Sequence, residues 1–347
     1  MKELLPIAII IMVFVIIFQI SKTSEYVSVL KGEEKSSKQN NKINAFLLVS
    51  FLVLGLFGAW WCNDLYYNKT LFVQGSASKE GVAIDNMLWI TIVVTGLVFV
   101  ITQVLLFWFS FKYQARDDKK VYFFPHSTKL ELIWTTIPAI FLTVLVVYGL
   151  INWFKITSDA PKDAVLIEIT GHQFKWEARY PGPDKVLGKK NYKLTTAVNS
   201  LGVDFSDKFS LDDIHVDGTE IHMPVNRPIK LVINSQDVIH DVGLSHFRMK
   251  MDAVPGIPTT MWFTPRYTTK EMQERTNNPN FAYEISCDQM CGAGHFNMRG
   301  VITVDTEQEY EKWLAMLKPE YFTVHPEAAP KTDTSKVMTA SVMPLKK

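Results

Sequence analysis

Apolar residues form long uninterrupted segments in the first half of the chain and short alternating runs in the second. Four long segments lie before residue 156, at Leu4–Ile20, Ile43–Trp61, Met87–Phe111 and Leu132–Phe154. A helix needs about 20 mainly apolar residues to cross the hydrocarbon core of a membrane. We therefore expect a membrane anchor with about four transmembrane helices.

The first apolar segment follows a charged start, as the core of a signal peptide would. No small-residue cleavage site follows it, however. We therefore expect this segment to be retained as a helix.

Basic residues in the connecting loops predict the direction of each crossing, because cytoplasmic loops are rich in lysine and arginine. The loops near 21–42 and 112–131 hold five such residues each, whereas the loop near 62–86 holds two. We therefore expect the first and third loops on the cytoplasmic side and both termini outside. In a bacterium this predicts a multi-pass protein of the inner membrane with its C-terminal domain in the periplasm.

From residue 164 onward, the pattern changes to short alternating runs that predict β-strands. Turn residues such as Pro181-Gly182-Pro183 and Pro255-Gly256 separate these runs. Many short strands with turns of this kind indicate an all-β sandwich or barrel. The expected strands are 164–170, 174–180, 228–235, 237–244, 281–287 and 300–305, followed by a short helix at 307–317 and an irregular tail from Lys318.

The net charge of the chain limits the classes of molecule that it is expected to bind. The formal net charge is +1, which argues against nucleic-acid binding because phosphate contacts need a basic face. Membrane lipid is the partner that the apolar segments predict. An acid-rich stretch is interpreted as a solvated loop, with steering of a basic cytochrome as the alternative; it consists of Asp204, Asp207, Asp212, Asp213, Asp217 and Glu220.

Cysteine usage points to metal or redox chemistry. The chain has three cysteines, which is not the pattern of a disulfide framework. Cys62 ends an apolar run and is interpreted as a membrane-boundary thiol without a role, since Trp60 and Trp61 make a poor lipidation signal. There is no C-x2-C-H motif for covalent haem.

The strongest chemical signal is CDQMCGAGHFNM at residues 287–298, which places two thiols, one imidazole and the Met298 thioether within twelve residues. Soft sulfur ligands favour copper, and imidazole suits it too. A mononuclear blue-copper site needs one cysteine, whereas Cys287 and Cys291 together can bridge two copper ions. Each copper then needs its own imidazole, for which His295 and, from an earlier strand, His240 are the candidates.

Two other interpretations of this motif stay open from the residues alone. A C-x3-C pair can be a redox pair. Zinc can be held by two cysteines and two histidines, although Met298 would then have no purpose.

Residues 287–298 resemble the binuclear copper (CuA) motif of cytochrome c oxidase subunit II. The stretch HDVGLSHFRMKMDAVPG, residues 240–256, is similar to the family segment that starts at the first copper histidine. The resemblance covers roughly 86–317 and implies a cupredoxin-type β-barrel after a two-helix hairpin. It implies that Cys287 and Cys291 bridge two copper ions, with His240 and His295 as terminal ligands and two weak ligands, Met298 and the backbone carbonyl of Gln289.

The resemblance also implies a division of the chain. Residues 1–62 would be an extra N-terminal transmembrane helix pair, and 63–155 the transmembrane hairpin typical of the family. Residues 156–317 would form the periplasmic copper domain, and 318–347 an irregular C-terminal tail.

Two further motifs are similar to family sequences. GHQFKW, residues 171–176, resembles the run GHQWYW, whose first tryptophan receives the electron from cytochrome c; Phe174 stands at that position, and Trp176 is kept. Ordinary strand packing is the alternative for both. ELIWTTIPA, residues 131–139, resembles the segment whose glutamate stands at the mouth of a proton path, which would be Glu131 here. A favourable charge at a helix N-terminus is the alternative for Glu131.

Gln289 departs from the family pattern. The family usually has a glutamate here, whose carboxylate helps to hold a magnesium ion at the interface with subunit I. A neutral amide is a poorer ligand for this hard cation.

The resemblance implies the electron-accepting subunit of a respiratory haem–copper terminal oxidase. Electrons from cytochrome c would pass through the copper pair to haem in the catalytic subunit I, which reduces oxygen to water and pumps protons, so no catalytic residue is expected in this chain. Because Phe174 and Lys175 replace the usual aromatic pair, we expect a cytochrome c domain held in a stable supercomplex as the donor. Other oxidase subunits are expected partners.

Three other functions fit the sequence less well. A membrane-anchored copper chaperone would have a thioredoxin-like α/β pattern, a quinol oxidase subunit would lack the copper ligands, and nitrous-oxide reductase would need a large propeller domain.

Overall fold

The computed structural model describes residues 4–116, 118–120 and 122–329. The chain forms two compact units. One consists of residues 1–73 and 88–144, and the other of residues 74–87 and 145–347.

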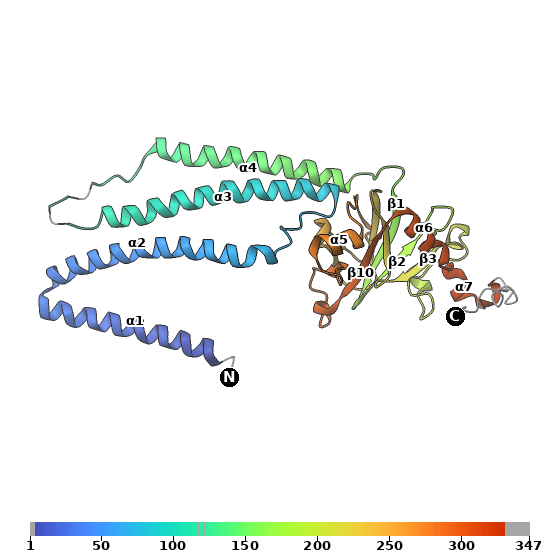
Figure 1. Cartoon of the computed structure of the whole chain (residues 1–347), viewed down its shortest axis with the longest axis horizontal. Helices are drawn as coiled ribbons and strands as arrows, with labels where there is room; N and C mark the ends of the chain where they lie inside the picture. The colour runs from blue at the N-terminus through green and yellow to red at the C-terminus, as the bar shows by residue number, and fades with distance from the viewer. Residues whose placement is uncertain (1–3, 117, 121, 330–347) are drawn as a thin grey trace, which may run out of the picture. The chain divides into compact units, whose positions relative to one another are not determined.

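Four long helices account for the membrane segments (Figure 1). Within the part of the chain that the structure describes, each is long and apolar enough to cross a membrane, and most of its apolar side chains are exposed. Helices satisfy their own backbone hydrogen bonds, as a lipid environment requires. The predicted transmembrane helices are thus confirmed, and each ends beyond its apolar segment: α1 (Leu4–Lys31), α2 (Glu33–Tyr66), α3 (Lys79–Lys112) and α4 (Thr128–Thr157).

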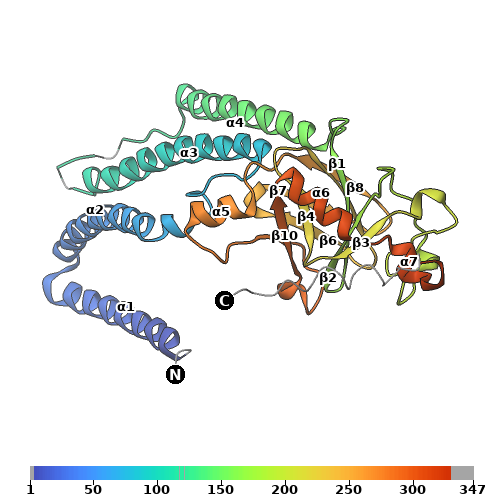
Figure 2. The same ribbon diagram turned by 45° about the vertical axis from the view of Figure 1, so that its right-hand side comes forward.

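The β-rich unit contains two five-stranded sheets (Figure 2). The first sheet has the order β3-β2-β1-β5-β8 and the second β4-β10-β9-β6-β7. The strands are β1 (Val165–His172), β2 (Lys175–Tyr180), β3 (Ile214–Asp217), β4 (Ile221–Pro224), β5 (Ile229–Ser235), β6 (His240–Leu244), β7 (Met249–Ala253), β8 (Thr259–Phe263), β9 (Tyr283–Cys287) and β10 (Arg299–Asp305).

Short helices complete this unit. They are α5 (Thr269–Thr276), α6 (Glu307–Met316) and α7 (Glu320–Val324), with 3-10 turns η2 (Tyr192–Leu194), η3 (Lys208–Ser210), η4 (Ser245–Phe247), η5 (His295–Asn297) and η6 (Pro326–Ala328); a further turn, η1 (Tyr67–Lys69), follows α2 in the other unit.

The strands alternate between the core and the outer surface, as the pleat of a sheet requires. On β2, Trp176, Ala178 and Tyr180 point into the core and are fully buried. On β1, Ile169 pairs with Ala178, and both Ile169 and Ile167 are buried as well. The alternation that predicted an all-β domain is therefore the alternation that builds its core.

Several elements differ from the sequence prediction. β6 begins at His240 rather than at residue 237, because Val238 donates to the Asp237 side chain in a tight turn. The short strands β3, β4, β7 and β8 and helix α5 were not predicted. Residues 320–328, expected to be irregular, form α7 and η6, and the rest of the tail from 330 lies outside the described residues.

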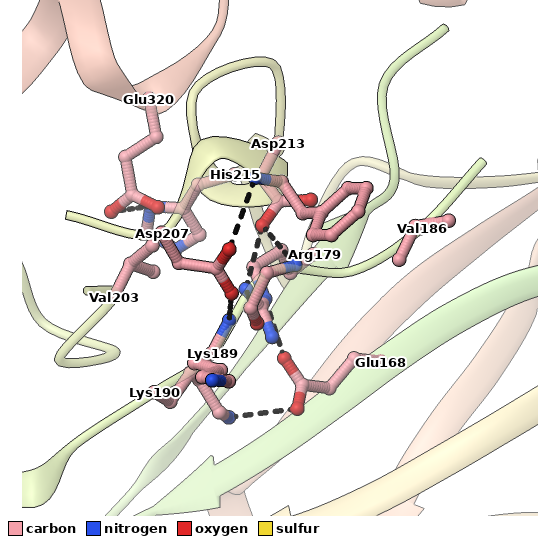
Figure 3. A network of polar contacts seen from close by, with 12 residues as sticks. Glu168, Arg179, Val186, Lys189, Lys190, Val203, Asp207, Asp213, His215 and Glu320 are labelled. Carbon is pink, nitrogen blue, oxygen red and sulfur yellow. Dashed lines mark hydrogen bonds and ion pairs between the residues drawn. The ribbon is translucent and has the colours of Figure 1, made fainter. Parts of the chain in front are cut away.

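A long connection, residues 181–213, covers the outer face of the first sheet through buried charges (Figure 3). The Arg179 guanidinium lies 2.6 Å from Glu168 and 2.7 Å from Asp213, and all three side chains are buried. Asp213 also accepts the Gly188 N–H at 3.0 Å. The interpretation of the acid-rich stretch as a solvated loop is therefore wrong for Asp213, which is buried because Arg179 neutralises it.

Replacement of Arg179 by methionine should destabilise the protein strongly. It would leave the Asp213 carboxylate buried without a cation and Glu168 with Lys190 alone, and an unpaired buried charge typically costs about 3–5 kcal/mol. Denaturant unfolding followed by tryptophan fluorescence measures this loss. The matched control is Lys270→Met, which removes an exposed ion pair to Glu309 and should cause no measurable loss. Equal stability of the two variants would contradict this account of the connection.

Candidate metal centre

Two thiols form the middle of the candidate metal centre. The sulfur atoms of Cys287 and Cys291 lie 3.7 Å apart and are not joined in a disulfide. An imidazole nitrogen approaches each of them: Nδ1 of His240 lies 3.7 Å from the Cys287 sulfur, and Nδ1 of His295 lies 3.6 Å from the Cys291 sulfur. The structure thus brings the two thiols and the two imidazoles together, and their roles as copper ligands stay a prediction.

Two weaker donors complete the set. The Met298 sulfur lies 3.8 Å from the Cys291 sulfur, and the Gln289 carbonyl oxygen lies 3.1 Å from the Cys287 sulfur. Both are at the positions that the resemblance implies for weak axial ligands. Their assignment as copper ligands stays a prediction.

Neighbouring strands and one loop bring these atoms together. Cys287 is the last residue of β9 and His240 the first of β6, and the two strands pair through Val242 and Cys287. The other donors lie on the loop that leads to β10, residues 288–298, which we name the copper loop. The Cys287 N–H donates to the Met298 carbonyl at 3.1 Å, so both ends of the loop are tied together.

Glycine is required at one point of this loop. The Phe174 ring, from the turn between β1 and β2, packs directly on Gly294. A Cβ at residue 294 would lie 2.5 Å from a ring carbon of Phe174, which is closer than van der Waals contact allows. The Phe174 ring thus packs against the residue that precedes His295 in the sequence.

The donor set fits copper. His240, Met298 and both cysteines are buried, and His295 is half-buried. Among the described residues, His240, Cys287 and Cys291 offer ligand atoms within 4.8 Å of one another. Soft sulfur donors combined with imidazole in a dry site favour copper over hard cations such as magnesium.

Burial also affects the thiols themselves. Burial, together with the adjacent Cys287 thiol, raises the pKa of the Cys291 thiol to about 11. A thiol must lose its proton to bind a metal ion. Metal binding here therefore releases protons and should weaken as the pH falls.

Sequence reasoning missed two residues that hold the ligands in place. The Asp237 carboxylate accepts from Nε2 of His240 at 2.7 Å, which leaves Nδ1 of His240 to face Cys287. Its second oxygen accepts the Gln173 N–H at 2.7 Å, and the Gln173 side chain donates to the Cys291 carbonyl at 2.6 Å. Carboxylates in this position orient metal-bound histidines and increase their basicity. The available signal was a carboxylate three residues before a candidate ligand.

The two aromatic residues of the 171–176 motif occupy different environments. Trp176 is only 1% exposed, and its ring lies 6.0 Å from the His240 ring in an edge-on arrangement. Phe174 is 38% exposed. Direct contact with a donor protein is therefore available to Phe174 and not to Trp176.

The remaining predicted site residues lie on the surface of the chain. Glu131 is exposed in the first turn of α4. The Gln289 side chain, on the copper loop itself, is exposed, although the Gln289 backbone carbonyl faces Cys287. Their predicted roles involve a partner subunit and stay predictions.

Asp237→Ala should weaken metal binding without unfolding the domain. Loss of such a carboxylate typically lowers metal affinity by about 10–100-fold. Competition with a copper chelator measures this change. Asp184→Asn is the control, because Asp184 only accepts the Val186 N–H in an exposed turn. Unaltered affinity in Asp237→Ala would show that this carboxylate does not support the ligand.

A membrane anchor followed by an all-β domain with paired cysteines, histidines and a methionine defines a class of membrane-anchored proteins with a candidate copper site. The sequence comparisons specify the family. Residues 67–151 match the sequence model of the cytochrome c oxidase subunit II transmembrane domain, and residues 165–305 match that of the subunit II periplasmic domain. The chain therefore belongs to the cytochrome c oxidase subunit II family.

The chain is also similar to individual proteins and to a solved structure. The chain is 28% identical over 272 residues to the alternative cytochrome c oxidase subunit 2 of Bradyrhizobium diazoefficiens, covering 78% of this chain and 89% of the relative. It is 24% identical over 260 residues to cytochrome c oxidase subunit 2 of Thermostichus vulcanus, covering 68% and 76%. The crystal structure of the periplasmic domain of subunit II of cytochrome oxidase from Bradyrhizobium japonicum matches with 26% identity and a TM-score of 0.31, covering 45% of this chain and 94% of that domain.

These results confirm the predicted family and fold class, namely transmembrane helices followed by an all-β domain of the cupredoxin type. The protein is a membrane protein with a periplasmic-type domain. The division of the chain at residues 62, 155 and 317 stays a prediction.

Proposed function

We propose that this chain is the subunit through which electrons from cytochrome c enter a respiratory haem–copper terminal oxidase of the bacterial inner membrane. The observation that carries the proposal is the pair of buried thiols 3.7 Å apart with one imidazole against each. Such a symmetric set suits two metal ions that share their ligands. The family assignment makes a partner oxidase subunit, in which oxygen is reduced, the destination of the electrons.

In this proposal, Cys287 and Cys291 would hold two copper ions between them, and His240 and His295 would each hold one. The bound pair would supply a one-electron relay whose charge is spread over two metals. The protein keeps the ligands in place and excludes water: Met298 and His240 are fully buried, and Asp237 fixes the His240 ring. A closed site of this kind has no open position for a substrate.

Exposed apolar side chains surround the copper loop and support a docking surface for the donor. Met290 is 74% and Phe296 76% exposed, and both flank cysteine or histidine ligands in the sequence. Phe174 packs against the loop with one side and is exposed to solvent on the other. Apolar contact at the centre of the surface favours a donor domain held close, such as a cytochrome c domain of a supercomplex.

Two polar positions would face the catalytic subunit I. Glu131 would serve as the cytoplasmic mouth of a proton path that supports proton pumping. A magnesium ion at the subunit interface would have to use the amide oxygen of Gln289 or rely on the partner, because an amide is a poorer ligand than a carboxylate for this cation.

Copper loading of the full-length chain in detergent tests the proposal. We expect two copper ions per chain and a seven-line mixed-valence electron paramagnetic resonance spectrum, because one unpaired electron would be shared equally by both nuclei. Copper uptake should be greater at pH 8 than at pH 6, because the thiols must lose their protons. Cys291→Ser is the matched variant and should not give the seven-line spectrum.

One copper ion per chain with a four-line spectrum would contradict a shared pair. No copper uptake, together with a reducible Cys287–Cys291 disulfide, would favour a copper chaperone instead.

A further inference from the structure

The segment that leads into α3 is hydrogen-bonded to the corner that follows β6. The Ala77 N–H donates to the His246 carbonyl at 2.8 Å, and the Ser78 hydroxyl donates to the Phe247 carbonyl at 2.6 Å. His246 and Phe247 belong to η4, the turn directly after β6. Ser78 and Phe247 are buried, so water does not compete for these bonds.

Glu80, in the first turn of α3, connects the helix to two further elements. Its buried carboxylate accepts the Thr264 N–H at 2.8 Å and lies 3.6 Å from the Lys155 ammonium. Thr264 directly follows β8, and Lys155 lies in the last turn of α4. All three residues belong to the same compact unit.

Arg248 makes the second ionic contact to α3. Its guanidinium approaches the two Asp85 oxygens at 2.7 and 3.4 Å and also donates to the Ser245 carbonyl at 2.7 Å. Both Arg248 and Asp85 are mostly shielded from water, with side chains 14% and 13% exposed. The fork geometry binds a carboxylate at two points and so fixes its orientation as well as its distance.

The backbone of Arg248 shows that this contact has a conformational cost. Its φ of 60° lies in the left-handed region, which disfavours residues that have a side chain. A glycine would adopt this conformation without strain. The structure therefore keeps a strained residue at a position where its side chain reaches Asp85.

We propose that Asp85, Arg248 and Glu80 are positioning residues for electron transfer out of the copper centre. β6 starts at the predicted copper ligand His240 and ends at the corner that Arg248 and Ser78 hold. α3 continues from these contacts as one unbroken helix to Lys112. The contacts therefore fix the ligand-bearing strand to the start of a membrane helix by which a membrane-embedded partner would hold this chain.

Loss of these contacts should change the distance between the copper centre and the electron acceptor. It should leave the copper ligands in place. Electron transfer slows steeply as the gap between donor and acceptor widens, so a loosened contact would slow transfer and leave the copper site intact. The inference rests on the proposed function, because it needs an acceptor haem in the partner subunit.

The test uses the complete oxidase complex with Asp85→Asn or Arg248→Gly. Electron transfer from the copper pair to the acceptor haem is followed after photochemical reduction, and the copper spectrum is recorded on the same samples. We expect an unchanged spectrum and a clear loss of transfer rate. Arg248→Gly removes the contact together with the backbone strain, so it should fold at least as readily.

Two further variants make the test specific. Exchanging the partners, Asp85→Arg with Arg248→Asp, should recover the rate, because aspartate tolerates the left-handed conformation better than most residues. Glu309→Gln removes the exposed ion pair to Lys270 in the same unit and should leave the rate unchanged.

Normal transfer in both Asp85→Asn and Arg248→Gly would overturn the inference, as would equal slowing in Glu309→Gln or no recovery on exchange. Loss of copper or of assembly in Arg248→Gly would also overturn it, because the contact would then maintain the fold and not a distance. Absence of a copper pair from the wild-type complex would instead contradict the proposed function.

Discussion

Two sulfur atoms held 3.7 Å apart by a strand end and a loop are the constraint on which the rest of the site depends. Two thiolates at this distance repel each other strongly unless cations lie between them. Without metal, burial and the second thiol raise the pKa of Cys291 to about 11, so this thiol keeps its proton near neutral pH. The fold therefore creates the proximity by itself: the loop is closed by the Cys287–Met298 backbone bond and supported by Phe174 and Gln173.

The β1–β2 turn links this loop to the rest of the domain. Gln173 bonds to both the copper loop and Asp237, and Asp237 in turn holds His240 on β6. Three segments far apart in the sequence thus meet at one end of the sandwich. On the outer face of the first sheet, Arg179 holds the 181–213 connection in place. Such preorganisation of the predicted ligands would suit the proposed electron relay, because little of the domain would have to move on electron transfer.

The ligand residues of the site could be predicted from the sequence. The residues that hold these ligands in place could not. Five of the six predicted ligand residues lie within twelve positions, and His240 was recognisable in a strand with a family-like continuation. Asp237 and Gln173 were missed because their roles depend on the meeting of two turns. Arg179 and Asp213 are 34 residues apart, and only the fold shows that a loop aspartate is neutralised in the interior. Strands of four or five residues, such as β3 and β7, are too short for their alternation to stand out. Helix α5 did have a readable start, the capping box of Thr268 and Glu271.

Copper-edge X-ray absorption of the loaded full-length protein tests the central claim most directly, because it reports the neighbours of each metal ion. The account predicts sulfur and nitrogen neighbours together with a short copper–copper contact, which two bridging thiolates would impose. Sulfur and nitrogen neighbours without any copper–copper contribution would contradict a shared pair. The two cysteines would then hold a single ion, and the role proposed for this subunit would be wrong.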